Sequence, residues 1–179
     1  MANREALREL QTRLASRLQA ARSEGLSIRW LAAHVGETRY LFPLAQCGEI
    51  FPWTPVQPAA YTQAWFLGVA NLRGGLCGVV DLVQFMDPDA VLAPVARTDA
   101  ALSECSLLSF NTVLELNCAL LVDQLSGLRG LDSFTASAAP ADGAPAYFGR
   151  VHTDAAGFSW QEINLLSLSQ LPSFLSISA

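Results

Sequence analysis

The apolar residues of this chain follow two different spacings. In residues 4–24 they recur every three or four positions, which predicts an amphipathic helix that begins after Asn3 and ends at Gly25. From Thr38 onward the apolar runs are short, β-prone and separated by proline and glycine. This second pattern predicts strands at residues 39–44, 49–54, 67–73, 76–82, 106–110, 113–122, 147–152 and 159–163.

Strands this short, broken by frequent turns, are typical of a mainly β fold, either a sandwich or small barrels. Gly74-Gly75 lies between two predicted strands and is expected to form a tight turn, because glycine adopts positive φ at little cost. Residues 133–145 are rich in alanine, serine and proline and are expected to form an exposed loop. Residues 165–174 have helical apolar spacing that Pro172 interrupts. One domain is therefore expected after the first helix.

Composition excludes several classes of function. The chain is 51% hydrophobic and only 15% charged, so it can bury a core that stabilises a fold. Its net charge is −5 and it contains no lysine, so it lacks the clustered positive field that nucleic-acid binding requires. The longest uncharged stretch, residues 50–72, contains three prolines and is not expected to span a membrane. We expect a cytoplasmic protein.

Residues that could carry out catalysis or bind a metal are scattered. The four cysteines are far apart without a CxxC pair, and there are two histidines, so neither a metal site nor a cofactor is expected. The motifs GxSxG, HExxH and the phosphate-binding loop are absent. The carboxylates of Asp87 and Asp89 flank Pro88, an arrangement more typical of a solvated turn than of an acid–base pair. We expect no catalytic residue and no enzymatic activity.

Arg73 stands at the end of a predicted strand, beside Gly74. An arginine on a rigid turn with no bulky neighbour is well placed to bind a carboxylate of a partner protein. The alternative is an ion pair within its own domain, with Asp81 or Glu49, and the spacing alone favours that alternative.

The segment around Arg73 closely resembles the CheW family of chemotaxis adaptors. The resemblance rests on Glu49-Ile50, the TPV run at residues 54–56, the GVANLRG run at 68–74 and the VVDL run at 79–82. A fainter match continues through ALLVDQLSG at residues 119–127 and into the last residues. The resemblance covers residues 28–179, the expected CheW-like domain, and leaves residues 1–27 as an N-terminal helical extension.

The resemblance implies two small five-stranded, SH3-like β-barrels that share a core, with a short C-terminal helix. It implies a scaffold that binds the cytoplasmic tip of a methyl-accepting chemoreceptor and the regulatory domain of a CheA-type histidine kinase, within receptor arrays at the inner membrane. Family roles then carry to individual residues: receptor binding to Arg73, Asn71 and Leu72, kinase binding to Glu49 and Gly68, and a structural role in the turn to Gly74, Gly75 and Asp81.

Two further interpretations accompany this one. The N-terminal extension and the WFLG run at residues 65–68 resemble family members that serve type IV pili and twitching motility. The competing interpretation is a small barrel that binds another peptide, with Trp53, Trp65 and Phe66 lining an aromatic groove.

Overall fold

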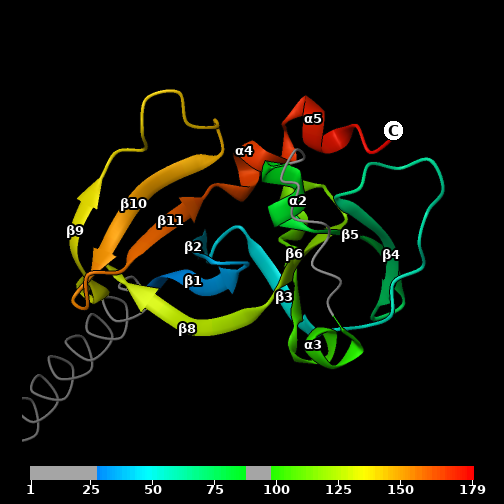
Figure 1. Cartoon of the computed structure of the whole chain (residues 1–179), viewed down its shortest axis with the longest axis horizontal. Coiled ribbons are helices and arrows are strands. Elements are labelled where there is room, and N and C mark those ends of the chain that lie inside the picture. The colour runs from blue at the N-terminus through cyan, green and yellow to red at the C-terminus, as the bar shows by residue number, and fades with distance from the viewer. Residues whose placement is uncertain (1–27, 88–97) are drawn as a thin grey trace, which may run out of the picture.

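The computed structural model describes residues 28–87 and 98–179 (Figure 1). The helix predicted at residues 4–24 lies outside the described residues. Four short α-helices are described: α2 (Leu82–Met86), α3 (Asp99–Glu104), α4 (Leu165–Ser169) and α5 (Pro172–Leu175). Two 3₁₀ turns, η1 (Thr112–Leu114) and η2 (Leu131–Ser133), join strands. No described helix has the length and apolar composition needed to cross a membrane.

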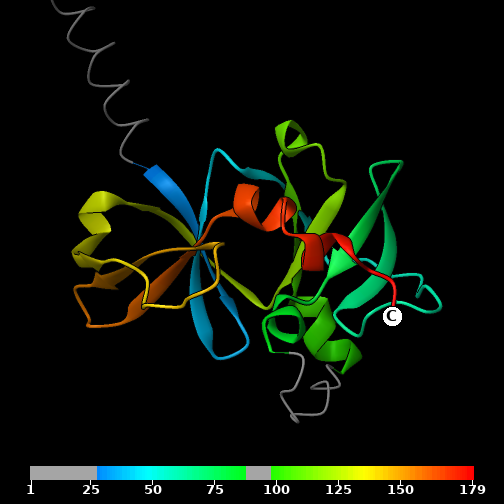
Figure 2. The ribbon, with the colours of Figure 1, turned by 90° about the horizontal axis from the view of Figure 1, so that it is seen from above.

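The strands form two mixed sheets that lie side by side (Figures 1 and 2). The six-stranded sheet has the order β8-β1-β2-β11-β10-β9, and its strands are β1 (Ile28–Val35), β2 (Thr38–Pro43), β8 (Gln124–Gly130), β9 (Phe134–Ala138), β10 (Phe148–Asp154) and β11 (Ser159–Ile163). The five-stranded sheet has the order β3-β6-β7-β5-β4, and its strands are β3 (Cys47–Pro52), β4 (Phe66–Leu72), β5 (Gly75–Val80), β6 (Ser106–Phe110) and β7 (Cys118–Val122).

The mainly β class is confirmed, but the expectation of five strands in each unit was wrong for one sheet. The sequence pattern did not predict three of the strands, namely β1, β8 and β9. Strand β9 lies inside the predicted loop at residues 133–145; it is an edge strand of sequence FTASA that pairs only with β10. The predicted strand at residues 113–122 is divided, because Glu115 adopts a left-handed backbone (φ 52°) after η1 and β7 begins at Cys118.

The main core lies between the two sheets, and β7 shows how it is built. All five residues of β7 are buried. Cys118, Leu120 and Val122 face the core shared by both sheets, while Ala119 and Leu121 face a smaller cluster enclosed by the five-stranded sheet. Successive side chains of a strand point to opposite faces, so a strand buried on both sides requires an unbroken apolar run.

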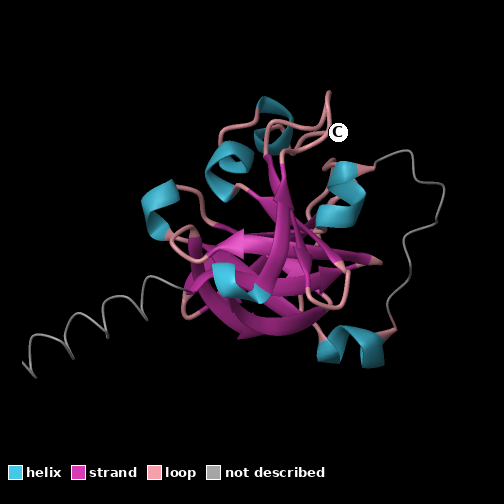
Figure 3. Ribbon diagram, turned by 90° about the vertical axis from the view of Figure 1, so that its left-hand side faces the viewer, coloured by secondary structure: helices cyan, strands magenta, loops and turns pink. Residues whose placement is uncertain are grey.

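Strand β1 has the same two-sided character in the other sheet. Leu31, Ala33 and Val35 enter the shared core, whereas Trp30 and Ala32 pack against Leu41 and Trp160 in a cluster enclosed by the six-stranded sheet. Figure 3 shows the curvature of the strands around this enclosed side. The two sheets therefore cannot be separated without exposing one face of β1 and of β7.

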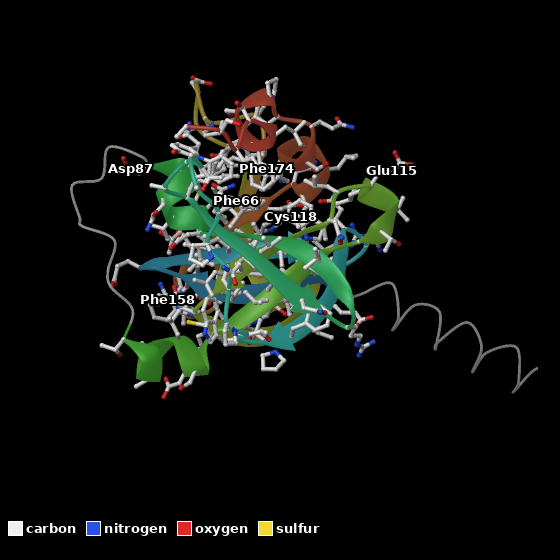
Figure 4. All side chains as sticks on the ribbon, turned by 90° about the vertical axis from the view of Figure 1, so that its right-hand side faces the viewer. Phe66, Asp87, Glu115, Cys118, Phe158 and Phe174 are labelled. Carbon is white, nitrogen blue, oxygen red and sulfur yellow. The ribbon has the colours of Figure 1, made fainter. Side chains whose placement is uncertain are left out.

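The C-terminal segment closes the shared core through one aromatic ring. Helices α4 and α5 cross the junction between the sheets (Figure 2). The Phe174 ring on α5 is stacked between the rings of Trp65, at a centroid distance of 5.8 Å, and Phe110, at 6.0 Å. It also meets the ring of Phe85 edge to face at 5.1 Å. Figure 4 shows Phe174 among the densely packed side chains in this part of the molecule.

We predict that Phe174→Ala lowers the free energy of unfolding by about 3–5 kcal/mol, because it removes a buried ring and leaves a cavity. Leu175→Ala is the matched control: Leu175 is the next residue of the same helix and is 51% exposed. Leu175→Ala should lower the free energy of unfolding by less than about 1 kcal/mol. Urea denaturation followed by tryptophan fluorescence gives both values, and equal losses would show that α5 does not anchor the core.

The four cysteines are buried as free thiols. Burial raises the pKa of the Cys47 thiol to about 12 and also raises the pKa of the Cys77 and Cys118 thiols. Because the thiolate is the reactive form, these groups are neutral and unreactive at pH 8.

We therefore expect no thiol of the native protein to react with Ellman's reagent within minutes at pH 8. All four should react once the chain is unfolded in guanidinium chloride. Rapid reaction of one thiol in the native protein would contradict the packing of the cores described above.

Candidate functional site

The segment singled out by the sequence forms a hairpin of β4 and β5. Leu72 pairs with Gly75, so the two residues between them, Arg73 and Gly74, form the turn. Both have positive φ, 50° and 84°, as the commonest two-residue hairpin turn requires. The expected turn at Gly74-Gly75 is thus displaced by one residue, because Gly75 already belongs to β5.

Asn71 stabilises this turn from within. Its side-chain Oδ1 accepts a hydrogen bond from the Gly74 amide at 2.8 Å. A Cβ atom placed on Gly74 would meet no atom within 4 Å, so the turn projects into open space. The loop therefore holds Arg73 in a defined backbone conformation while leaving the tip accessible to another molecule.

Arg73 is paired within the chain, and its partner is Glu49 of β3. The Arg73 Nη1 atom lies 2.9 Å from Oε1 and 2.8 Å from Oε2 of that carboxylate. The alternative that Arg73 pairs inside its own domain is confirmed for Glu49. Both side chains stay accessible, with exposed fractions of 74% for Arg73 and 52% for Glu49.

The ion pair joins the two edge strands of the five-stranded sheet. Glu49 stands on β3 and Arg73 directly follows β4, and these strands lie at opposite edges in the hydrogen-bonding order. The Arg73 guanidinium also lies 5.8 Å from the centroid of the Phe51 ring. The residues expected to contact the receptor and the kinase are therefore in direct contact with each other.

Exposed apolar residues accompany the pair. Ile50, which follows Glu49, is 44% exposed, and Leu76, which pairs with Asn71 in the hairpin, is 69% exposed. We call Glu49, Ile50, Asn71, Arg73 and Leu76 the turn surface. Apolar side chains beside polar ones are the composition expected of a protein-binding surface. The sequence analysis missed Ile50 and Leu76 because nothing in the pattern separates them from core residues.

Gly68 and Leu72 are less accessible than the turn surface. Gly68 is buried and has a φ of 131°, and a Cβ atom there would overlap the backbone carbonyl of Gln57. The Gln57 segment lies directly on β4, since its backbone exchanges two hydrogen bonds with Val69. Leu72 is half-buried and packs against the cluster that the five-stranded sheet encloses.

Asp81 lies at the far end of β5 from the turn. Its carboxylate accepts hydrogen bonds from the amides of Val83 and Gln84 and thereby caps the N-terminus of α2. Its own amide donates to the Trp65 carbonyl at 2.8 Å. Asp81 therefore orders the connection from β5 to α2, whereas Gly74 and Gly75 belong to the hairpin.

The structure does not favour a peptide groove of aromatic side chains. Trp65 is 6% exposed and belongs to the shared core, and Phe66 packs against that core. Trp53 packs against the cluster within the five-stranded sheet. Within residues 28–87 and 98–179, no three histidine, cysteine or acidic side chains are grouped closely enough to hold a metal ion.

Comparison with known proteins points to one family. The model of the CheW-like domain family matches residues 29–171. The "Chemotaxis protein CheW" of Rhizobium meliloti (strain 1021) is 37% identical over 51 residues, which is 28% of this chain and 33% of that protein. The aligned part thus spans a third of that relative's length.

A solved structure has the same fold. The crystal structure of the scaffolding protein TtCheW from Thermoanaerobacter tengcongensis superposes with a TM-score of 0.60, covering 76% of this chain and 88% of that one, at 13% identity. The family model covers most of the chain, and apart from Ile28 both sheets lie within the residues that it matches. The chain belongs to the CheW-like domain family.

Proposed function

We propose that this protein is a chemotaxis-type scaffold that couples a methyl-accepting chemoreceptor to a CheA-type histidine kinase. The observation that carries the proposal is the turn surface, where Arg73 and Glu49 stand together, exposed, beside Ile50 and Leu76. Membership of the CheW-like family supports the partners, as does the shared fold with TtCheW, which is described as a scaffolding protein. Such a scaffold works at the cytoplasmic side of the inner membrane, in receptor arrays.

In this proposal Arg73, Asn71 and Leu72 serve the receptor and Glu49 and Gly68 serve the kinase. Arg73 offers several donors of its guanidinium beyond the Nη1 atom bound to Glu49, and these can bind a receptor carboxylate. Glu49 retains acceptor capacity for a donor on the kinase. Because the two side chains are paired, the partners would meet at adjacent positions, and each contact would adjust the geometry of the other.

Signalling through such a scaffold requires a difference in free energy between two arrangements of the assembly. The adaptor holds receptor and kinase in one geometry, and the receptor signal changes the relative stability of the two arrangements. A coupling free energy of about 1–3 kcal/mol is typical of allosteric systems. The exposed Arg73–Glu49 pair can supply a small part of this coupling, at most about 1 kcal/mol, when a receptor group competes for the guanidinium.

We expect Arg73→Glu to weaken receptor binding at least about 100-fold, because placing like charges together costs several kcal/mol. Breaking an exposed ion pair should lower the thermal midpoint by no more than about 4 °C. The measurement is a pull-down of the purified protein with a receptor tip and with a kinase regulatory domain from the same cell, and Glu49→Arg is the corresponding kinase-side variant.

The double variant Arg73→Glu/Glu49→Arg is the decisive control. It restores an ion pair of reversed polarity at the same place. If the partners recognise the charges, the double variant stays defective for both. Recovery of both interactions would show that the pair acts only to hold β3 against the hairpin, and the assignment of Arg73 and Glu49 as contact residues would then be abandoned.

Gly68→Ala should destabilise the fold by about 2–4 kcal/mol, since it places a side chain at positive φ and against the Gln57 carbonyl. Urea denaturation measures the loss. Gly74→Ala is the control, because its Cβ has open space and only the cost of the backbone angle remains. A stable Gly68→Ala variant that fails to bind the kinase would instead place Gly68 in the contact itself.

We further propose that the scaffold serves the chemosensory system of type IV pili and controls twitching motility. The support is the resemblance of residues 1–27 and of the WFLG run at residues 65–68 to members of that subtype. Deletion of the gene should abolish twitching on agar and leave swimming chemotaxis intact. The reverse outcome would assign the scaffold to a flagellar system.

A further inference from the structure

A recess lined by two arginines opens at the end of the six-stranded sheet, on a different sheet from the turn surface. It has a volume of about 480 Å³, and its walls include His34 of β1, Arg39 of β2, Arg129 of β8 and Phe158, with Trp160 of β11 also lining it. Phe158 lies in the turn between β10 and β11, and Figure 4 shows it apart from Phe66 and Phe174 in that view. A volume of this size is typical of sites for small molecules.

Each arginine of the recess lies over an aromatic ring, and the charge of Arg129 also acts on the Asp154 carboxylate, where it adds to the hydrogen bond from Trp160 in lowering the pKa. The Arg39 guanidinium lies 4.0 Å from the centroid of the Phe158 ring, and that of Arg129 lies 5.3 Å from the Trp160 ring. Within the described residues, no carboxylate lies at ion-pair distance from either guanidinium. Stacking on a ring orients a guanidinium and leaves its N–H donors available to a ligand.

The one carboxylate of the recess is already used by the structure. Asp154 Oδ1 accepts hydrogen bonds from the amides of Ala156, at 3.0 Å, and Phe158, at 2.9 Å, and Oδ2 accepts one from the Trp160 indole at 2.9 Å. These bonds fix the β10–β11 turn and the Trp160 ring. Two arginines against one aspartate leave an excess of one positive charge in the recess, on a chain whose net charge is −5.

A β-bulge shapes the remaining wall. Strand β8 pairs Gly127 with Ala32 and Leu125 with Ala33, so Ser126 is an extra residue in the ladder. Gly127 makes the bulge possible with a φ of 86°, and Ser126 lines the recess. Bulges are frequent beside binding sites, where they redirect a side chain.

We propose that this recess binds a small organic anion, a carboxylate or phosphate carried on a flat apolar body. Arg39 and Arg129 bind the anionic group, and the exposed Phe158 ring contacts the body. The observations favour a small molecule over an acidic peptide, because peptides bind along grooves or at strand edges, whereas this site is an open recess with the β10–β11 turn as one wall. The proposal does not depend on the scaffold function.

The test uses the indole N–H signals of the full chain in a ¹⁵N–¹H correlation spectrum. The chain has four tryptophans, and Trp160→Phe assigns the signal at the recess. The probes are phenyl phosphate and benzoate, with neutral benzyl alcohol as the control for the aromatic body. We expect a saturable shift of the Trp160 signal with at least one anion in the millimolar range, no shift of Trp65, and no saturation with benzyl alcohol.

Arg39→Gln and Arg129→Gln should each weaken the binding at least about tenfold, because each removes charge-assisted hydrogen bonds. Arg150→Gln is the matched control, since Arg150 is an exposed arginine of the same sheet that bonds Ser137. Equal weakening in all three variants, or no saturable shift with either anion, would overturn the proposal. A hexaglutamate peptide that shifts Trp160 at tenfold lower concentration than both anions would overturn it in favour of a polypeptide ligand.

Discussion

The architecture depends on two strands that are buried on both faces. Strands β1 and β7 each supply alternate residues to the shared core and the intervening residues to a second cluster within their own sheet. This arrangement leaves little freedom for slippage, because moving either strand by one residue would exchange the two sets of side chains between clusters of different shape. The relative positions of the two sheets, and of everything attached to them, follow from this constraint.

The turn surface is held in place by its attachment to that core. Strand β5 pairs in parallel with β7, so the hairpin that carries Arg73 is fixed to the most buried strand of its sheet. On the other side, β3 pairs with β6 and presents Glu49. The ion pair then forms between two edges whose positions the core has already determined. Its contribution to stability is small because both groups are solvated, which leaves them available for exchange with charges on a partner.

Two surfaces of different chemistry therefore lie on two different sheets. The turn surface combines a satisfied ion pair with exposed Ile50 and Leu76, a composition that suits a protein partner. The recess of the six-stranded sheet combines two guanidinium groups with aromatic rings, a composition that suits an anion. Because each sheet has its own enclosed cluster in addition to the shared core, a ligand on one surface need not disturb the other.

Local patterns in the sequence were sufficient for the β class, the strands at residues 106–110 and 159–163 and the hairpin around Arg73. The roles of Arg73 and Glu49 as contact residues came from the family resemblance and stay predictions. Local patterns were insufficient for β8 and β9, where alanine, glycine and small polar residues carry little β preference, and these strands exist because they pair with neighbours distant in the sequence. Strand β1 was also missed, although its sequence IRWLAAHV contains residues with high β preference. Local patterns were insufficient, too, for the contact of Arg73 with Glu49, which the sequence offered as one of two pairings, and for the meeting of Arg39, Arg129 and Trp160 around one recess. Propensity and turn chemistry act between near neighbours along the chain, whereas these contacts join residues that only the packing of two sheets around a common core brings together.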